Sequence, residues 1–169
     1  MTMTLTATGL TGTALTALIR RTVATLATTS PAGRPHAANV LYAAMPGADG
    51  LPRLYVSTDR ASRKARNVAA NPHVAVTVPV RRLPVGPPSA VQFQGTADIL
   101  ELDDPELRAL AAAGRIAAVT GHGELDRPGG CFLRVRPGRR LHTYGLGMSL
   151  WTLLRDPLNA AGVAELPAA

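Results

Sequence analysis

Apolar and polar residues alternate along several short segments of this chain, and such alternation predicts half-buried β-strands. Residues 23–28 read VATLAT, and comparable runs follow at 35–44, 53–58, 74–80, 90–102, 131–136 and 139–144. Turn-forming residues separate the runs, as in Ser30-Pro31-Ala32-Gly33-Arg34. The segment 81–89 holds three prolines and a glycine, which block ladder and helix hydrogen bonds, so we expect a loop there. About six antiparallel strands at this spacing predict a small β-barrel.

Other segments show helical spacing or helix-start residues instead. Apolar residues recur helically over 10–19, and further short helices are expected at 62–70, 105–113 and 148–155. Trp151 is expected on the apolar side of the last helix, and Gly95 predicts a bulge in its strand. We therefore expect a flexible arm at 1–9, one barrel domain over 10–156 and a loose tail at 157–169.

Charge and composition exclude several classes of partner. The net charge is +7, but the arginines are scattered and aromatic residues make up only 4%, so the clustered footprint of a nucleic-acid binder is missing. No apolar run approaches the length of about 18 residues that a membrane span needs. The N-terminal segment lacks the basic start and continuous apolar run of a signal peptide, so we expect a cytoplasmic protein.

Disulfide and metal chemistry are not expected either. Cys131 is the only cysteine, which excludes internal disulfides and multi-cysteine metal sites, and its apolar flanks predict a buried thiol rather than a nucleophile. The four histidines (His36, His73, His122 and His142) do not form a metal-spaced set. We therefore assign no metal ligand.

The stretch from Ser57 to Val78 carries the clearest candidate chemistry. It begins at the end of a strand, and Ser62-Arg63-Lys64 then opens a helix. Free N–H groups of a first helical turn and the helix dipole attract anions, while arginine offers a planar fork for phosphate and lysine a point charge. Lys64 is also the only lysine in the chain. The alternative is a solvated basic helix face, because helix N-termini bind anions without specificity.

Several short motifs follow one another in a defined order between residues 20 and 145. They are Thr25-Leu26-Ala27-Thr28 with Gly33-Arg34-Pro35, then Leu54-Tyr55-Val56-Ser57-Thr58, Ser62-Arg63-Lys64-Ala65, Asn71-Pro72-His73-Val74, and 91–97 with Gly95. In this order they resemble the flavin-binding split-barrel family typified by pyridoxamine 5′-phosphate oxidase. The resemblance implies a mainly β fold: a six-stranded antiparallel split β-barrel of Greek-key topology with short peripheral helices.

The resemblance also implies a cofactor, a partner and a set of site residues. Relatives are homodimers that bind FMN, or in some cases a deazaflavin, in grooves at the subunit interface. Carried over to this chain, Arg63 and Lys64 would bind the cofactor phosphate, and Ser57 and Thr58 would lie alongside it. The strand segment Ala38-Asn39-Val40-Leu41 would pass under the isoalloxazine, mainly through its backbone.

Three positions depart from the pattern of the true oxidases. The oxidases carry an arginine and a lysine on the second strand, where this chain has Ala38 and Ala43. They also carry a glutamine five residues before the glycine that corresponds to Gly95, where this chain has Ala90. We expect Gln92 to share the face of Ala90 and to substitute for that glutamine, and Gln94 to face the other way. The C-terminal pyridoxal-phosphate signature is also missing, so pyridoxamine phosphate is not the expected substrate.

The leading functional hypothesis is an FMN-dependent oxidoreductase that acts on an unidentified small molecule. The cofactor would carry out hydride transfer, so no side chain is assigned as a catalytic acid or base. A deazaflavin-dependent reductase is one alternative. A non-catalytic protein that binds or sequesters a flavin or haem is another, and haem would require an axial ligand such as His36, Tyr42 or His142. A basic dimer that binds acidic partners is the third.

Overall fold

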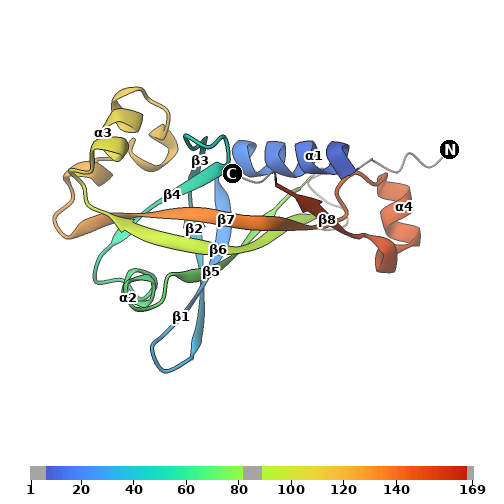
Figure 1. Cartoon of the computed structure of the whole chain (residues 1–169), viewed down its shortest axis with the longest axis horizontal. Helices are drawn as coiled ribbons and strands as arrows, with labels where there is room; N and C mark the ends of the chain where they lie inside the picture. The colour runs from blue at the N-terminus through green and yellow to red at the C-terminus, as the bar shows by residue number, and fades with distance from the viewer. Residues whose placement is uncertain (1–6, 82–88, 167–169) are drawn as a thin grey trace.

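One curled antiparallel sheet organises the chain, as the computed structural model of residues 7–81 and 89–166 shows (Figure 1). Its hydrogen-bonded order is β2-β1-β5-β6-β7-β4-β3, and β8 pairs with β7 outside this path. The strands are β1 (Val23–Thr29), β2 (Pro35–Leu41), β3 (Ala43–Pro46), β4 (Pro52–Asp59), β5 (His73–Pro79), β6 (Ala90–Leu100), β7 (Gly130–Tyr144) and β8 (Ala161–Glu165). The helices are α1 (Ala7–Arg20), α2 (Arg63–Ala70), α3 (Pro105–Ala112) and α4 (Leu150–Arg155), with 3-10 turns η1 (Ala117–Val119), η2 (Glu124–Asp126) and η3 (Pro157–Asn159).

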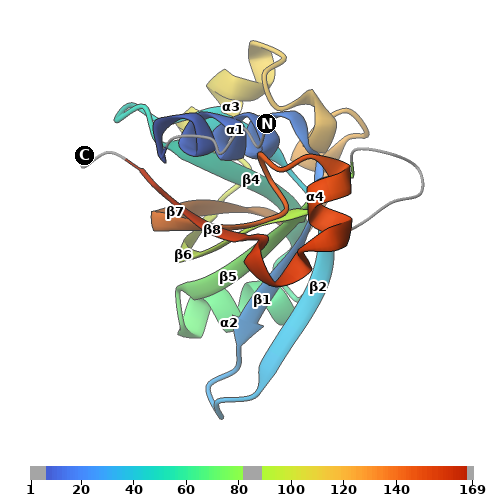
Figure 2. The same ribbon diagram turned by 90° about the vertical axis from the view of Figure 1, so that its right-hand side faces the viewer.

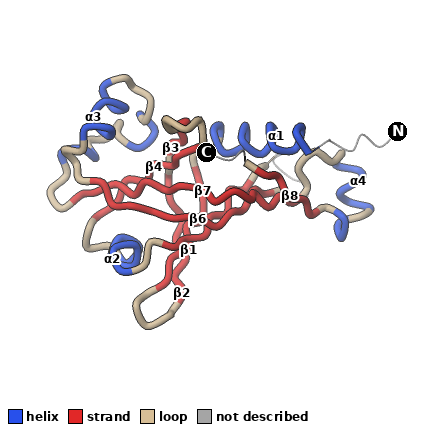
Figure 3. Tube along the Cα trace, in the orientation of Figure 1, coloured by secondary structure: helices blue, strands red, loops and turns tan. Residues whose placement is uncertain are grey.

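The predicted fold class is confirmed, but the described residues form eight strands rather than six. The sheet curls into a half-barrel, and short helices lie around it, as the tube in Figure 3 makes visible. The two strands predicted at 131–136 and 139–144 are a single strand of 15 residues, β7. Pro137-Gly138 does not break that strand because its pairing with β6 shifts register at this point and absorbs the irregularity.

Gly95 marks that register shift on β6, so the predicted bulge is confirmed. A Cβ atom at Gly95 would lie 2.1 Å from the backbone carbonyl oxygen of Arg136. A Cβ atom at Gly138, on the facing strand, would lie 2.9 Å from the carbonyl oxygen of Gln94. Two backbones therefore approach each other where only glycine fits.

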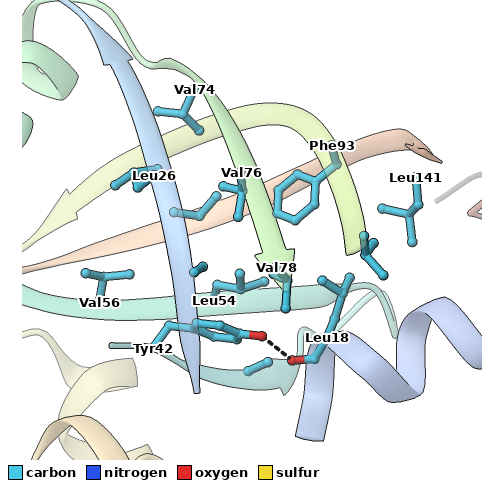
Figure 4. Close-up of a cluster of buried hydrophobic side chains, with 14 of the residues drawn as sticks. Leu18, Leu26, Tyr42, Leu54, Val56, Val74, Val76, Val78, Phe93 and Leu141 are labelled. Carbon is cyan, nitrogen blue, oxygen red and sulfur yellow. Dashed lines mark hydrogen bonds between the residues drawn. The ribbon is translucent and has the colours of Figure 1, made fainter. Parts of the chain in front are cut away.

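The barrel interior is filled by aliphatic side chains, the ring of Phe93 and the phenol of Tyr42 (Figure 4). The hydroxyl of Tyr42 donates a hydrogen bond of 2.9 Å to the carbonyl oxygen of Leu18, which fixes α1 against the barrel. Among the inward-facing side chains only about 10 Å³ of space remains, enough for about one water molecule. The residues around this space are Ala24, Leu26, Val40, Tyr42, Leu54, Val56, Val76 and Val135. The interior therefore has no room for a cofactor.

A second apolar cluster lies where α3 and η1 cover the outer side of β4 and β7. Tyr55 and Phe132 are buried there together with Leu107, Ile116 and Val119. The described residues thus form two cores, one inside the barrel and one beneath α3.

Several sequence-based predictions about the ends of the chain need correction. α1 begins at Ala7, so part of the expected arm at 1–9 is helical, and the rest of that arm lies outside the described residues. The expected loose tail contains η3 and β8, because Ala164 and Leu166 are buried against the barrel. Trp151 is 72% exposed, and Leu153 is the buried residue of α4. Most of the predicted 81–89 loop lies outside the described residues.

Candidate functional site

The N-terminus of α2 brings together residues for which the sequence predicts anion binding. The hydroxyl of Ser62 caps the helix by accepting a hydrogen bond of 3.3 Å from the N–H of Ala65, and it lies 3.1 Å from the hydroxyl of Thr58. The N–H groups of Arg63 and Lys64 have no acceptor among the described residues. Two backbone donors and two hydroxyls therefore converge at the positive end of the helix dipole.

Two cations without protein partners flank these donors. Arg63 is exposed and Lys64 is half-buried, and neither forms a hydrogen bond or ion pair within residues 7–81 and 89–166. The nearby Arg60, by contrast, is paired with Glu101. Burial raises the pKa of the Cys131 thiol, while the charges of Arg60 and Lys64 act in the opposite direction. The basic pair is thus available for an external anion.

Ser57 and Thr58 point to opposite sides of β4. Thr58 faces the helix cap, as its contact with Ser62 shows. Ser57 lies on the same side as Tyr55 and is paired with Phe132 on β7. The structure therefore brings Thr58 to the α2 terminus and directs Ser57 toward the other face of the strand.

The segment Ala38–Leu41 belongs to β2, which is an edge strand. It pairs only with β1 among the strands described, so one row of its backbone polar groups has no strand partner. Val40 is buried in the barrel, whereas Asn39 points outward and accepts a hydrogen bond of 2.9 Å from the hydroxyl of Thr25. Leu41 is 59% exposed. This edge therefore exposes backbone donors and acceptors that no described strand pairs with.

The outer face of the sheet next to this edge carries no charged side chain over two adjacent rows of β2, β1, β5 and β6, whereas on β7 the exposed Arg140 lies on the same side as His142. The rows are Asn39–Thr25–Thr77–Gln92–His142 and Ala37–Ala27–Ala75–Gln94, each residue paired with the next across the strands. Leu41 and Val23, themselves paired, continue the face with 59% and 45% exposure. In a chain with 29 charged residues (18 basic and 11 acidic), an uncharged exposed face of this width is typical of a protein interface.

Gln92 lies on this uncharged face, far from the α2 terminus of its own chain. Thr58, which contacts the α2 terminus, pairs with Cys131 on β7. The next residue of β7, Phe132, pairs with Leu100 on β6, so the terminus lies level with Leu100. Eight residues of strand correspond to about 26 Å. The expectation that Gln94 faces the other way from Gln92 is wrong, because both are exposed on either side of buried Phe93.

The candidate haem ligands differ in accessibility. Tyr42 is fully buried and its hydroxyl is bonded to Leu18, so it cannot reach a cofactor. His36 is half-buried and His142 is exposed. Across the described part of the chain, no group of three or more histidine, cysteine or acidic side chains is arranged to hold a metal ion. None of the helices described is both long and apolar enough to span a bilayer.

A charged network beneath α3 is absent from the sequence-based predictions. The Tyr55 hydroxyl donates to Glu106, Arg134 binds both Glu106 and Asp98, and Arg136 also binds Asp98. Burial and the Glu106 carboxylate raise the pKa of Tyr55. These residues become neighbours only through the β4–β7 and β6–β7 registers, which no local motif encodes. Because each charge is paired within the network, we interpret it as the attachment of α3 to the sheet.

The apolar cluster beneath α3 explains why Ala43 stands where the true oxidases carry a cation. Ala43 pairs with Tyr55 and is buried in the apolar group beneath α3. Ala38, the other replaced cation, is half-buried on β2. A lysine at position 43 would place an ammonium group in an apolar environment, which is costly without a partner.

Comparisons with known proteins agree with this geometry. The family model of pyridoxamine 5′-phosphate oxidase matches residues 10–143. The chain is similar to general stress protein 26 from Bacillus anthracis, with 21% identity, a TM-score of 0.58, and 93% of this chain and 98% of that one covered. HutZ, a heme storage protein from Vibrio cholerae, has 20% identity and a TM-score of 0.63, with 78% and 92% covered.

A conserved hypothetical protein from Mycobacterium tuberculosis has 26% identity and a TM-score of 0.52, with 75% of this chain and 80% of that one covered. At these identities the solved structures support the fold. A comparison with curated protein sequences found no match.

Proposed function

The chain belongs to the pyridoxamine 5′-phosphate oxidase family, and from this premise we propose that it is a flavin-dependent oxidoreductase that binds FMN and acts on a small molecule. The observation that carries the proposal is the α2 terminus. Within the part of the chain that the structure describes, Arg63 and Lys64 lack protein partners there, beside two free N–H groups and the Ser62 and Thr58 hydroxyls. This donor set suits a phosphate monoester, because charge-assisted hydrogen bonds to phosphate are the strongest that such groups form.

The filled barrel restricts where the rest of the cofactor would lie. With about 10 Å³ left inside, a flavin ring would have to bind outside the barrel, and the unpaired edge of β2 offers backbone donors and acceptors. When bound, FMN supplies hydride-transfer chemistry. The chain would hold the phosphate, orient the ring and exclude water, and we assign no side chain as acid or base.

We further propose that the protein is a homodimer joined through the uncharged face of β2, β1, β5 and β6. Such a face would be covered by a second copy that presents the same uncharged rows. Gln92 is remote from the α2 terminus of its own chain. In this arrangement it would reach only the cofactor site beside the partner's Lys64. The cofactor groove would then be completed by two chains.

The substrate is not proposed to be pyridoxamine phosphate. The two cations that the true oxidases carry on the second strand are replaced by Ala38 and Ala43. A substrate phosphate would lack those partners here. We propose an uncharged or weakly charged small molecule, since the face beside the β2 edge carries hydrogen-bonding but no ionised side chains.

The visible spectrum of the purified protein, before and after addition of FMN, tests the proposal. Flavin absorption maxima and a stoichiometry of one FMN per chain are the expected result. A deazaflavin band would favour the deazaflavin-dependent reductase, and a Soret band would favour the haem-binding alternative. A protein that neither carries nor takes up FMN contradicts the proposal. Sedimentation should give a dimer, and a monomer at micromolar concentration would contradict the interfacial groove.

A further inference from the structure

α2 is fixed to the barrel through a buried polar contact that the proposed function does not require by itself. The side-chain amide of Asn67 donates a hydrogen bond of 2.9 Å to the hydroxyl of Thr28. Asn67 is 4% exposed and Thr28 is 2% exposed. Both side chains otherwise lie where the neighbouring residues, Ala65, Val68 and Leu26, are apolar and buried. A polar pair placed in such surroundings costs desolvation that an apolar pair would avoid.

The two partners connect the two separate parts of the proposed cofactor site. Asn67 lies four residues after Arg63 and three residues after Lys64, so it shares their side of α2 one turn further along, where it is buried. Thr28 lies on β1 and pairs with His36 on β2, and its hydroxyl also contacts the His36 carbonyl oxygen at 3.4 Å. The contact therefore runs from the phosphate-binding turn to the hairpin that carries Ala38–Leu41. Figure 2 shows α2 beside this hairpin.

A directional contact limits motions that apolar packing alone permits. α2 has only eight residues, and its remaining buried side chains are Ala65 and Val68, which are small. Small aliphatic contacts resist separation but tolerate sliding and rotation about the helix axis. A hydrogen bond between two fully buried groups has one favourable geometry, because departure leaves the amide unsatisfied.

We infer that Asn67 and Thr28 are positioning residues, which hold the Arg63–Lys64 turn at a fixed distance and rotation relative to strand β2. The inference rests on the proposed function, since it assumes that a phosphate binds the turn and a ring binds the strand. A cofactor that bridges the two elements would bind most tightly when their separation is set beforehand. Loss of the contact should therefore weaken ligands that engage both ends and spare those that engage one.

The test compares FMN with riboflavin, which has the same ring but no phosphate. Thr28→Val removes the hydroxyl at nearly constant shape, and Thr28→Ser retains it. We expect Thr28→Val to weaken FMN binding about tenfold, as loss of one buried hydrogen bond would, and to leave riboflavin binding unchanged. Thr28→Ser should restore FMN affinity. Thr143→Val, a buried strand threonine at the far end of β7, should change neither affinity.

A second measurement does not depend on any cofactor. Amide hydrogen exchange of the apo protein should rise about tenfold in residues 66–70 of Thr28→Val and of Asn67→Ala, where the N–H groups are bonded within α2, while β5 and β6 keep their protection. Equal losses for FMN and riboflavin, or unchanged exchange in α2, would overturn the inference. If wild-type protein bound FMN no better than riboflavin, the phosphate site of the proposed function would fail, and the exchange data would still decide whether Asn67 holds α2 in place.

Discussion

Removal of the unpaired cations at the α2 terminus is the most direct test of the phosphate site. Lys64 is half-buried beside Thr58 and Ser62, whereas Arg63 is exposed, so their contributions to binding should differ. A charge-assisted hydrogen bond in a shielded position contributes about 2 kcal/mol. An exposed ion pair contributes only about 0.7 kcal/mol, because solvent and salt screen it.

These values translate into distinct losses of FMN affinity. Lys64→Ala should raise the dissociation constant about 30-fold and Arg63→Ala about threefold. The double variant should lose about 100-fold if the two contributions add. Fluorescence titration of flavin into apo protein measures all three, and riboflavin affinity should stay unchanged because that ligand has no phosphate.

Arg66→Ala provides the matched control. Arg66 is also an exposed cation on α2, but it lies in the second turn, past the free N–H groups. Its removal takes the same charge from the helix without touching the proposed site. If Arg66→Ala weakened FMN as much as Lys64→Ala, the effect would reflect general attraction by a basic helix, and the proposed phosphate site would be refuted.

Three further predictions concern the barrel and its titratable groups. Gly95→Ala should lower the Tm by more than about 5 °C, because its Cβ would lie 2.1 Å from a backbone oxygen. The control is Gly12→Ala in α1, where a Cβ meets nothing within 4 Å; it should raise the Tm by about 2 °C. Burial raises the pKa of Tyr55, so this phenol ionises first in the unfolded state as the pH rises above about 10. The free energy of unfolding should then fall by up to about 1.4 kcal/mol per pH unit. Urea titrations across this pH range should show a smaller fall for Tyr55→Phe. Cys131 is fully buried with a raised pKa, so thiol reagents should label it only under denaturing conditions, and rapid native labelling would contradict its placement.

Local patterns are sufficient to predict most of the fold. The Asp104-Pro105 start of α3 and the Ser62 cap of α2 both appear in the structure, because capping depends on a few adjacent residues. Alternation locates most of the strands for the same reason. Gly95 is identifiable as a bulge because a glycine inside a strand commonly marks a bulge or the close approach of another backbone.

Features that depend on register cannot be predicted in this way. The network from Tyr55 through Glu106 and Arg134 to Asp98 forms only because β4, β6 and β7 align as they do. The prediction for Trp151 is wrong because a helix as short as α4 has no complete apolar stripe, so its buried side is set by what it packs against. The Asn67–Thr28 contact joins residues 39 positions apart, and neither has a local motif that announces it.

The composition of the barrel explains why its candidate site lies at the surface. Valine, leucine and alanine line an interior with about 10 Å³ left, so the chain fills its barrel with aliphatic side chains and keeps no internal cavity for a cofactor. Gln92 then lies on a different part of the surface of one chain from the phosphate turn and the edge of β2. If a dimer brings them together, FMN and the second chain bind the same surface and must stabilise each other. Apparent FMN affinity should therefore weaken when the protein is diluted below its dimer dissociation constant, and FMN should slow subunit exchange. A dissociation constant for FMN that stayed the same across that dilution would show that one chain binds the cofactor alone.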